Sequence, residues 1–392
     1  MSVANWPRLI TVSIVGVLLA LALGAQAISS VSTRTAPDTS VSFFSANGLA
    51  REQLAFVAFS ADVSEPDDAP EAARAVSEIA LAAVLADPLT PKAHAILALA
   101  SADDSARRAI LNAAAQLNRR DLSLQGLVLQ EHLTAADYPR SIETLNQLLR
   151  VHPEYSREFF PVLAGALAEE ETIPLFAEML DNSSPWHARF LNFAVRRREV
   201  LPNLALLRPQ IDVENETFDR RLIAALAGVG DIEGAESLYR EIAGINSGLR
   251  SQGLIDWRSD FPPFEWRLVD EAGFRAQQSL SGEELELSIR PGKGGVIAAR
   301  LLAAPTAPFE ISVKHRIAPA DQLRDVRLQL ICAETTTPFY DERFSRQGEA
   351  FRIEELPVDC PYMVIAINAR AWSGRSALSG IVEQVRLTEL PS

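Results

Sequence analysis

The chain has little cysteine, a deficit of positive charge and no recognisable catalytic motif. Its 392 residues include two cysteines and five histidines, and 37 Lys and Arg stand against 51 Asp and Glu, a net charge of −14. Nucleic-acid binding requires clustered positive charge, so this balance argues against a nucleic-acid partner. Two thiols and dispersed histidines argue against a metal site. No phosphate-binding loop, serine-hydrolase elbow or C-x-x-C motif occurs, so we predict no catalytic residue, no metal and no cofactor.

Charged side chains are also absent from residues 9–33, and most of that stretch is aliphatic. Such a run partitions out of water, into a bilayer or into the export machinery. Arg8 precedes it and is expected to stay in the cytoplasm with the amino terminus. The sequence therefore predicts a signal-anchor segment over residues 1–33, with residues 34–392 in the periplasm or another extracytoplasmic space.

Two fates of this apolar segment remain open. Residues 9–28 form a run of 20 residues, which is long enough to span the inner membrane once as a retained anchor. Ala25-Gln26-Ala27 instead fits the small-x-small pattern of signal peptidase sites. Cleavage after Ala27 would release the mature chain, from Ile28, into the periplasm.

In the rest of the chain, the spacing of apolar residues changes once, from a helical period to a period of two. Residues 34–47 are rich in Ser and Thr and are interpreted as a polar tether. Residues 48–250 carry apolar side chains at helical spacing, and residues 263–392 alternate with a period of two, with a linker over 251–262. The fold class predicted is multidomain, with α-helices followed by β-strands in separate domains.

A helix-turn-helix pattern recurs in the helical part. In the clearest copy, a Gly230-Asp231 turn precedes a helix with Ala235, Tyr239 and Ile242 along one face. Small residues allow paired helices to approach closely, and a terminal proline ends the second helix. Other copies have their second helix at Ser141, Leu145, Leu148 and Pro153; Val76, Ala80, Ala83 and Pro88; Ala106, Ile110, Ala113 and Asn118; and Ile173, Ala177, Leu180 and Pro185.

On these residues, the chain resembles tetratricopeptide-repeat proteins over roughly residues 48–250. It departs from the consensus at the aromatic position of the first helix and in repeat length. The resemblance implies a curved α-solenoid whose concave face binds a peptide or protein partner, and it implies no enzymatic activity.

The C-terminal part contains about eight or nine predicted strands, which suggests a β-sandwich of jelly-roll type. Cys332 lies in one of them and Cys360 just before another, and in an oxidising compartment we expect them to form a disulfide. The strands are expected near 264–268, 273–278, 284–290, 296–303, 309–317, 326–333, 350–354, 362–368 and 380–388.

The layout as a whole is similar to a group of bacterial envelope proteins associated with exopolysaccharide production. Three short motifs carry the resemblance: Pro-Pro-Phe-Glu-Trp-Arg-Leu at residues 262–268, Leu-Ile-Cys at 330–332 and Val-Asp-Cys-Pro at 358–361. The predicted sandwich also looks like carbohydrate-binding modules in its strand count. Similarity at the level of fold does not by itself establish sugar binding.

Aromatic side chains provide the candidate ligand-binding residues, because sugar rings pack their C–H faces on exposed aromatic rings. Trp372 lies in an expected loop, and Tyr340 lies between Phe339 and Asp341. Trp257 lies in the linker, where packing between domains is an equal alternative. Trp266 alternates with Phe264 and Leu268, which favours the core.

Three hypotheses of function follow. The leading one is a non-enzymatic, membrane-anchored envelope adaptor, with a protein partner on the helical repeats and polysaccharide on the sandwich. The second is a secreted or periplasmic carbohydrate-binding protein that uses the repeats as a spacer. The third is a glycan-active hydrolase, which requires two carboxylates in one cleft; the carboxylates available are Asp256, Asp260, Glu265, Asp341 and Glu342.

Overall fold

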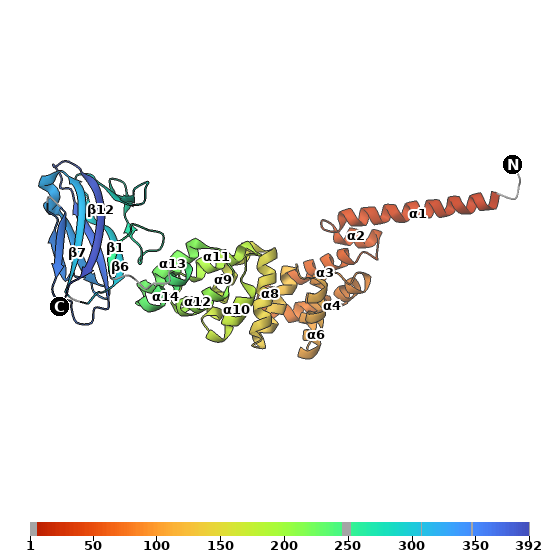
Figure 1. Cartoon of the computed structure of the whole chain (residues 1–392). Coiled ribbons are helices and arrows are strands. Elements are labelled where there is room, and N and C mark those ends of the chain that lie inside the picture. The colour runs from red at the N-terminus through yellow and green to blue at the C-terminus, as the bar shows by residue number, and fades with distance from the viewer. Residues whose placement is uncertain (1–5, 245–251, 307, 346–347, 392) are drawn as a thin grey trace. The chain divides into compact units, whose positions relative to one another are not determined.

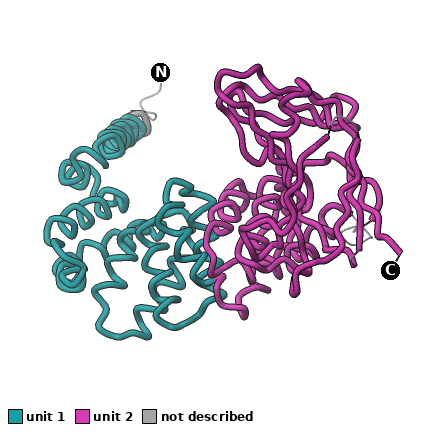
Figure 2. The backbone as a smooth tube through the Cα atoms, turned by 90° about the vertical axis from the view of Figure 1, so that its left-hand side faces the viewer, with its two compact units in different colours: residues 1–166 teal, residues 167–392 magenta. Residues whose placement is uncertain are grey.

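A computed structural model describes residues 6–244, 252–306, 308–345 and 348–391 of the chain. Helices come first and antiparallel strands follow, as the sequence predicts (Figure 1). The chain forms two compact units, residues 1–166 and 167–392, and the second contains both helices and strands (Figure 2). The expected boundary between the repeats and the linker, at residues 250 and 251, lies outside the described residues.

Fourteen α-helices occupy the described residues up to 244. From α3 to α8 each helix packs on the next, and in the second unit α10 packs on α12, α11 on α13 and α13 on α14. Their bounds are α1 Trp6–Ser32, α2 Pro37–Phe43, α3 Gly48–Asp62, α4 Ala69–Ala86, α5 Pro91–Ala100, α6 Asp104–Leu117, α7 Leu122–Thr134, α8 Tyr138–Val151, α9 Ser156–Leu167, α10 Ile173–Met179, α11 Pro185–Ala194, α12 Leu201–Leu207, α13 Glu216–Gly228 and α14 Ile232–Ile242.

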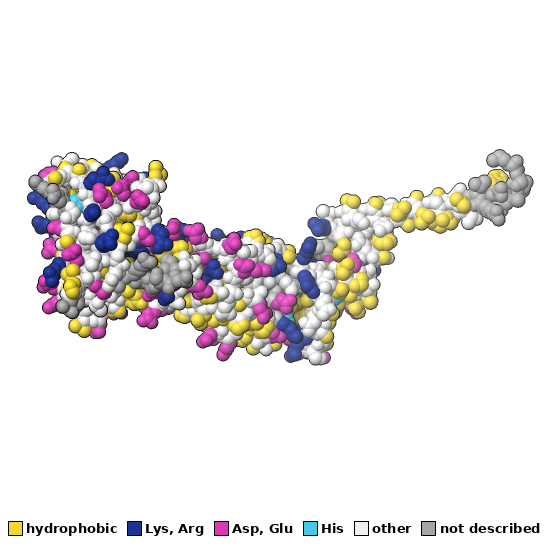
Figure 3. Space-filling view, viewed as in Figure 1, with side chains coloured by type: hydrophobic (Ala, Val, Ile, Leu, Met, Phe, Trp, Pro, Cys, Tyr) yellow, Lys and Arg dark blue, Asp and Glu magenta, His cyan; other side chains and the backbone are white. Residues whose placement is uncertain are grey.

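Helix α1 is long and apolar enough to cross a membrane. The stretch from Ile10 to Ser32 has a mean hydropathy of 2.1, and none of its most apolar window is buried within the protein. Apolar side chains show along the visible surface of this helix, together with uncharged atoms and with no charged side chain (Figure 3). An exposed apolar helix near the amino terminus is either a membrane anchor or a signal sequence. The side chain of Arg8 lies outside what the structure describes.

The segment interpreted as a tether contains a helix, α2, and a buried polar network. Ser29 at the end of α1 and Ser40 in α2 are fully buried, and their hydroxyl oxygens lie 2.8 Å apart. The Asn47 amide donates to the hydroxyls of Ser29 at 2.8 Å and Thr33 at 3.0 Å, and its oxygen caps α3. The polar residues that suggested a tether are thus hydrogen-bond partners that join three helices, which the composition alone does not reveal.

The helix-turn-helix spacing at residues 216–242 matches the buried positions. Gly230 adopts a φ of +95°, which glycine tolerates, and the Asp231 carboxylate caps α14 by accepting from the Gly234 amide at 3.0 Å. Ala235 and Tyr239 are buried, and Ile242, the third residue of the expected face, is partly buried.

Two other expected copies differ from the structure. In α6, the buried side chains are Leu111 and Ala114, one position later than expected, and Ala113 is exposed. Pro185 is the first residue of α11 and does not end the preceding helix. Proline is tolerated at the first helical position because an amide there has no hydrogen-bond partner within the helix.

Twelve strands make up two antiparallel sheets in the described part of the chain after residue 252. One sheet has the order β10-β7-β12-β5-β4-β3, with β1 paired to β12, and the other has the order β2-β6-β11-β8-β9. The bounds are β1 Gly253–Ile255, β2 Arg267–Leu268, β3 Asp270–Glu271, β4 Phe274–Gln278, β5 Leu285–Ile289, β6 Gly294–Ala303, β7 Phe309–Ala318, β8 Val326–Cys332, β9 Tyr340–Arg343, β10 Glu349–Ile353, β11 Tyr362–Arg370 and β12 Leu378–Glu389.

Both sheets contribute to one hydrophobic core, so they form the two layers of a β-sandwich. Side chains alternate as expected: in β8, Val326, Leu328 and Leu330 are fully buried while the residues between them are partly exposed. The expected strand over 264–268 is confined to Arg267–Leu268, because residues 262–264 form a turn and residues 265 and 266 belong to no strand. Short strands β1, β3 and β9 were not expected from the alternation.

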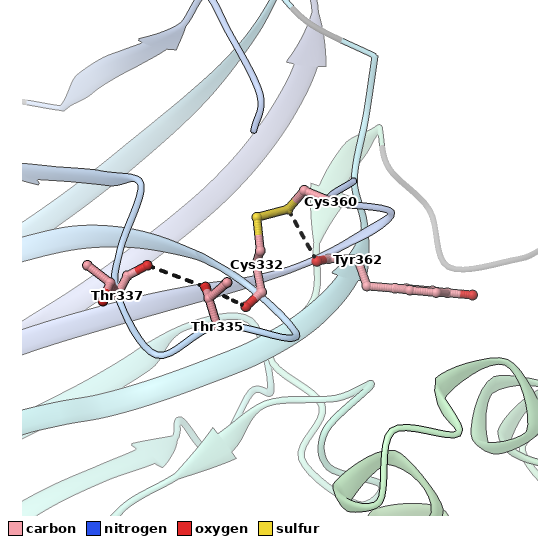
Figure 4. The surroundings of a disulfide bond; sticks show 5 residues. All are labelled: Cys332, Thr335, Thr337, Cys360 and Tyr362. Carbon is pink, nitrogen blue, oxygen red and sulfur yellow. Dashed lines mark hydrogen bonds between the residues drawn. A yellow bond between two sulfur atoms is a disulfide. The ribbon is translucent and has the colours of Figure 1, made fainter. Parts of the chain in front are cut away.

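Cys332 at the end of β8 and Cys360 before β11 form a disulfide, as predicted, with their Cα atoms 5.5 Å apart (Figure 4). The backbone of the loop after Cys332 turns back on it, since the Thr335 amide donates to the Cys332 carbonyl oxygen at 2.9 Å. The bond joins residues 28 positions apart in the chain. A disulfide of this kind is typical of an oxidising, extracytoplasmic compartment.

We expect the Cys332→Ala/Cys360→Ala variant to lose about 3–4 kcal/mol of folding free energy, the value for a loop of this length. Guanidinium unfolding at neutral pH measures this loss. The control is the reduced wild-type protein, which also lacks the disulfide but keeps both cysteines. A variant as stable as the oxidised wild type would contradict the prediction.

Candidate functional site

A buried carboxylate, Glu265, joins the last helix to the start of the sheets. Its side chain is 2% exposed and accepts a hydrogen bond from the Tyr239 hydroxyl of α14 at 3.1 Å. The backbone amides of Asp260 and Phe261 donate to its other oxygen at 2.7 and 2.9 Å. The Arg258 guanidinium lies 3.7 Å from it. Because every side of the carboxylate has a donor, its burial is compensated.

Aromatic packing surrounds this carboxylate. The Tyr239 ring stacks on Phe264, with ring centroids 5.3 Å apart, and lies 6.0 Å from the ring of Phe261. Burial, together with the negative charge of Glu265, raises the pKa of Tyr239, so its hydroxyl keeps its proton and donates. These contacts join α14 to residues 258–266 within the second unit.

Asp256 lies beside this cluster and is held by two arginines. Arg300 contacts it at 2.7 Å and Arg258 at 2.9 Å. Burial alone would raise the pKa of Asp256, but the hydrogen bonds and charges of Arg300 and Arg258 outweigh it and hold the pKa below its ordinary range. A carboxylate held ionised in this way is a poor proton donor, so it does not fit the general acid of a hydrolase.

Two other acidic residues considered for hydrolysis, Asp341 and Glu342, lie in strand β9, which contains neither Asp256 nor Glu265. Asp341 in β9 is paired with Arg327 of β8 at 2.5 Å, and Glu342 follows it in the same exposed strand. Asp260 contributes its backbone amide to Glu265. Glu265, although it lies in a turn, is not a solvated charge, because the turn at 260–265 folds its side chain inward onto two backbone amides.

Trp372 lies in the loop after β11 and is 51% exposed. The Arg370 guanidinium lies over its ring, 4.9 Å from the centroid. The Arg375 amide donates to the Trp372 carbonyl oxygen at 3.1 Å, and the Arg375 side chain pairs with Asp321 at the same distance. The loop is therefore held in place and presents an aromatic ring flanked by charged groups, which is an arrangement suited to a sugar ring.

The loop is anchored further by a buried amide and a neighbouring turn. Gln322 is 1% exposed and donates to the Ser376 carbonyl oxygen at 3.0 Å. Ala371 exchanges backbone hydrogen bonds with the turn between β5 and β6, donating to Lys293 and accepting from Gly292. These contacts bring three segments distant in sequence to one end of the sheets.

The other two aromatic candidates lie elsewhere. Trp257 is 2% exposed and packs on Trp266, with ring centroids 4.8 Å apart, so its ring has no face open to a ligand. Its burial favours the packing alternative, and Trp266 lies in the core as predicted. Tyr340 is partly buried in β9 and meets the ring of Phe351 edge-on.

In the first unit, a polar groove of about 370 Å³ lies along α6, α7 and α8. Its lining includes charged and amide side chains, and burial lowers the pKa of its histidine, His132, so that this ring is neutral at pH 7. The lining residues include Gln116, Arg119, His132, Arg140, Glu143 and Gln147. Within the described residues, no group of three or more His, Cys, Asp or Glu side chains is placed to hold a metal ion.

Comparison with known proteins gives no family assignment: no protein-family model and no curated protein matches the chain. Among solved structures, the chain is similar to accessory secretory protein 1, 2 and 3 of Streptococcus pneumoniae, with 9% identity over 37% of this chain and 99% of that chain and a TM-score of 0.24. It is also similar to TmCBM61 bound to β-1,4-galactotriose, with 9% identity over 34% and 99% and a TM-score of 0.22. Similarities of this size carry no argument about function.

We expect Tyr239→Phe to destabilise the second unit by about 1.5–3 kcal/mol, because it removes a hydrogen bond to a buried carboxylate and keeps the ring stack. Urea unfolding followed by the fluorescence of Trp257 and Trp266 measures the loss. Tyr340→Phe is the matched control, since the Tyr340 hydroxyl has no hydrogen-bond partner among the described residues. Equal stability of the two variants would refute this role of Tyr239.

The ion pairs of Asp256 also predict a pH dependence. Its folded-state pKa is lowered below the ordinary value of 3.8, so the stabilisation is complete above that value and is lost as the pH falls below it. We expect Asp256→Asn to cost about 1 kcal/mol at pH 7, because the pair is half exposed, and to cost progressively less below pH 3.8. Urea unfolding across this range, with Asp270→Asn as the exposed control, tests it; a difference independent of pH would count against it.

Proposed function

We propose that the chain is a non-enzymatic, membrane-anchored envelope adaptor. In this proposal α1 holds the protein in the cytoplasmic membrane, the helical repeats form an α-solenoid that binds a protein partner, and the β-sandwich, a jelly-roll, contacts polysaccharide. The observation that carries the proposal is an exposed apolar helix joined, in one chain, to a disulfide-bonded sandwich.

The network at the end of α1 supports retention of the helix. Cleavage after Ala27 would leave Ser29 as the second residue of the mature chain, although its side chain is fully buried against Ser40 and Asn47. A new amino terminus carries a charge, which would lie beside this buried network at a cost in desolvation. Retention keeps Ser29 inside a helix, where its contacts are preorganised.

The groove on α6, α7 and α8 is the proposed place for the protein partner. Its arginines, glutamines and Glu143 offer donors and acceptors of both signs, which suits a polar peptide segment. Trp372 is the proposed contact for polysaccharide, because its ring is exposed and its loop is fixed by Arg375 and Gln322. The role is non-catalytic in this proposal, since Asp256 and Glu265 are occupied by arginines and backbone amides.

The first experiment is purification of the full chain from native membranes after mild crosslinking, with identification of the co-purifying proteins and assay of bound sugar. Recovery of envelope assembly or export components on a membrane-integral protein supports the adaptor. A soluble mature protein beginning at Ile28 that carries sugar and no protein partner would support the periplasmic carbohydrate-binding protein instead.

For the sandwich, we expect Trp372→Ala to weaken polysaccharide binding at least tenfold, because stacking of an aromatic ring on a sugar is lost. Affinity electrophoresis of the full chain in detergent against the recovered polysaccharide measures this. Tyr138→Ala, which removes another ring that is 53% exposed, is the control and should leave binding unchanged. Equal binding by both variants would exclude Trp372 as the contact.

A further inference from the structure

A second groove, on the helices of the second unit, concentrates positive charge in an acidic protein. It measures about 590 Å³ and is lined by α11, the turn after it and the beginning of α13. Three arginines, Arg189, Arg196 and Arg221, contribute to its lining. All three are exposed, although acidic residues outnumber basic ones by 51 to 37 in the chain as a whole.

These arginines are not used within the fold to neutralise carboxylates. Among the described residues, neither Arg189 nor Arg196 nor Arg221 forms an ion pair, whereas the nearby Arg220 is paired with Glu216 at 2.5 Å. Arg221 donates one hydrogen bond, to the Asn192 side-chain oxygen at 3.0 Å. A guanidinium has five N–H donors, so most of those in the groove remain available to an anionic ligand.

Polar side chains hold the groove in shape. The hydrogen bond between Asn192 and Arg221 joins α11 to α13. Asn215 caps α13 by accepting from the Phe218 amide at 3.1 Å, and its amide group donates to the Ala188 carbonyl oxygen at 3.5 Å. The geometry is therefore built by the two helices and does not depend on a ligand.

We propose that this groove binds an acidic polysaccharide. Repeated carboxylates along such a polymer match several guanidiniums in one groove, and Asn192, Asn215 and Thr217 supply amide and hydroxyl groups for sugar hydroxyls. The site goes beyond the function proposed above, in which polysaccharide contacts only the sandwich.

Two other anionic partners fit the groove less well. Its lining offers only Ala188 and Phe193 for apolar contact, whereas protein interfaces depend on buried apolar or aromatic anchors. Glu214 also lines the groove and Glu216 lies exposed beside it, so a flat anionic bilayer would press against carboxylates. A flexible sugar polymer can place its carboxylates beside the arginines and its hydroxyls, which donate hydrogen bonds, beside Glu214, whereas a flat surface cannot sort its groups in this way.

The test uses the full chain in detergent and titrates it with polygalacturonate and with the same polymer fully methyl-esterified, which lacks the charge. The variant is Arg189→Gln/Arg196→Gln/Arg221→Gln. The matched control, Arg74→Gln/Arg157→Gln/Arg343→Gln, changes the net charge equally at other exposed positions. Unfolding midpoints of both variants check that the fold is intact.

We expect the groove variant to bind polygalacturonate at least tenfold more weakly than the wild type, and the control variant to bind within about twofold of it. Binding of polygalacturonate should weaken with added salt and should persist in Trp372→Ala, which separates this site from the sandwich. Unchanged binding by the groove variant, or equal binding of the esterified polymer, would overturn the proposal. Tighter binding of polyglutamate, or of phosphatidylglycerol nanodiscs, that is lost in the groove variant would also overturn it, in favour of an acidic protein or a membrane.

Discussion

One buried carboxylate joins the last helix of the second unit to the turn that enters its sheets. Glu265 accepts from the Tyr239 hydroxyl of the last helix and from two backbone amides of the turn that enters the sheets. A carboxylate buried to 2% exposure is tolerated only with donors around it, so its burial requires the helix, the turn and Arg258 to be placed together. A second contact, the hydrogen bond from the Tyr362 hydroxyl of β11 to Glu236 of α14 at 3.3 Å, also links the helices to the sheets within this unit.

Charge is distributed in two different ways across this unit. Around residues 256–265 each arginine faces a carboxylate, and both charges serve the fold. Between α11 and α13, three arginines line a groove without a carboxylate partner among the described residues. The same residue type thus has a structural role in one place and is available to a ligand in the other. The difference comes from which acidic side chains the fold brings near, and net charge does not reveal it.

Much of the architecture could be predicted from periodicity. The alternation in β8 and the Gly230-Asp231 turn are local patterns, and both have the burial and the cap that their spacing predicts. Prediction failed where residues contact partners distant in sequence. Ser40 and Asn47 lie in the segment interpreted as a tether, and they instead form a buried network with Ser29 of the apolar segment, between three helices. Trp257, in the expected linker, is buried for the same reason, because Trp266 packs on it. Of the candidate site, the exposure of Trp372 in a loop was predictable, but the contacts that fix the loop, from Asp321 and Gln322, were not.

By itself, the sequence determined the order of helices and strands, the apolar amino-terminal segment and the pairing of the two cysteines, because each follows from composition or short-range periodicity. Only the tertiary structure decided which charged residues are buried and which are exposed. Glu265 and Glu342 are the same residue type in the same half of the chain, yet one is enclosed by donors and the other faces solvent on an edge strand. The physical reason is that the state of a charge depends on its neighbours in space, and the fold draws those neighbours from distant parts of the chain.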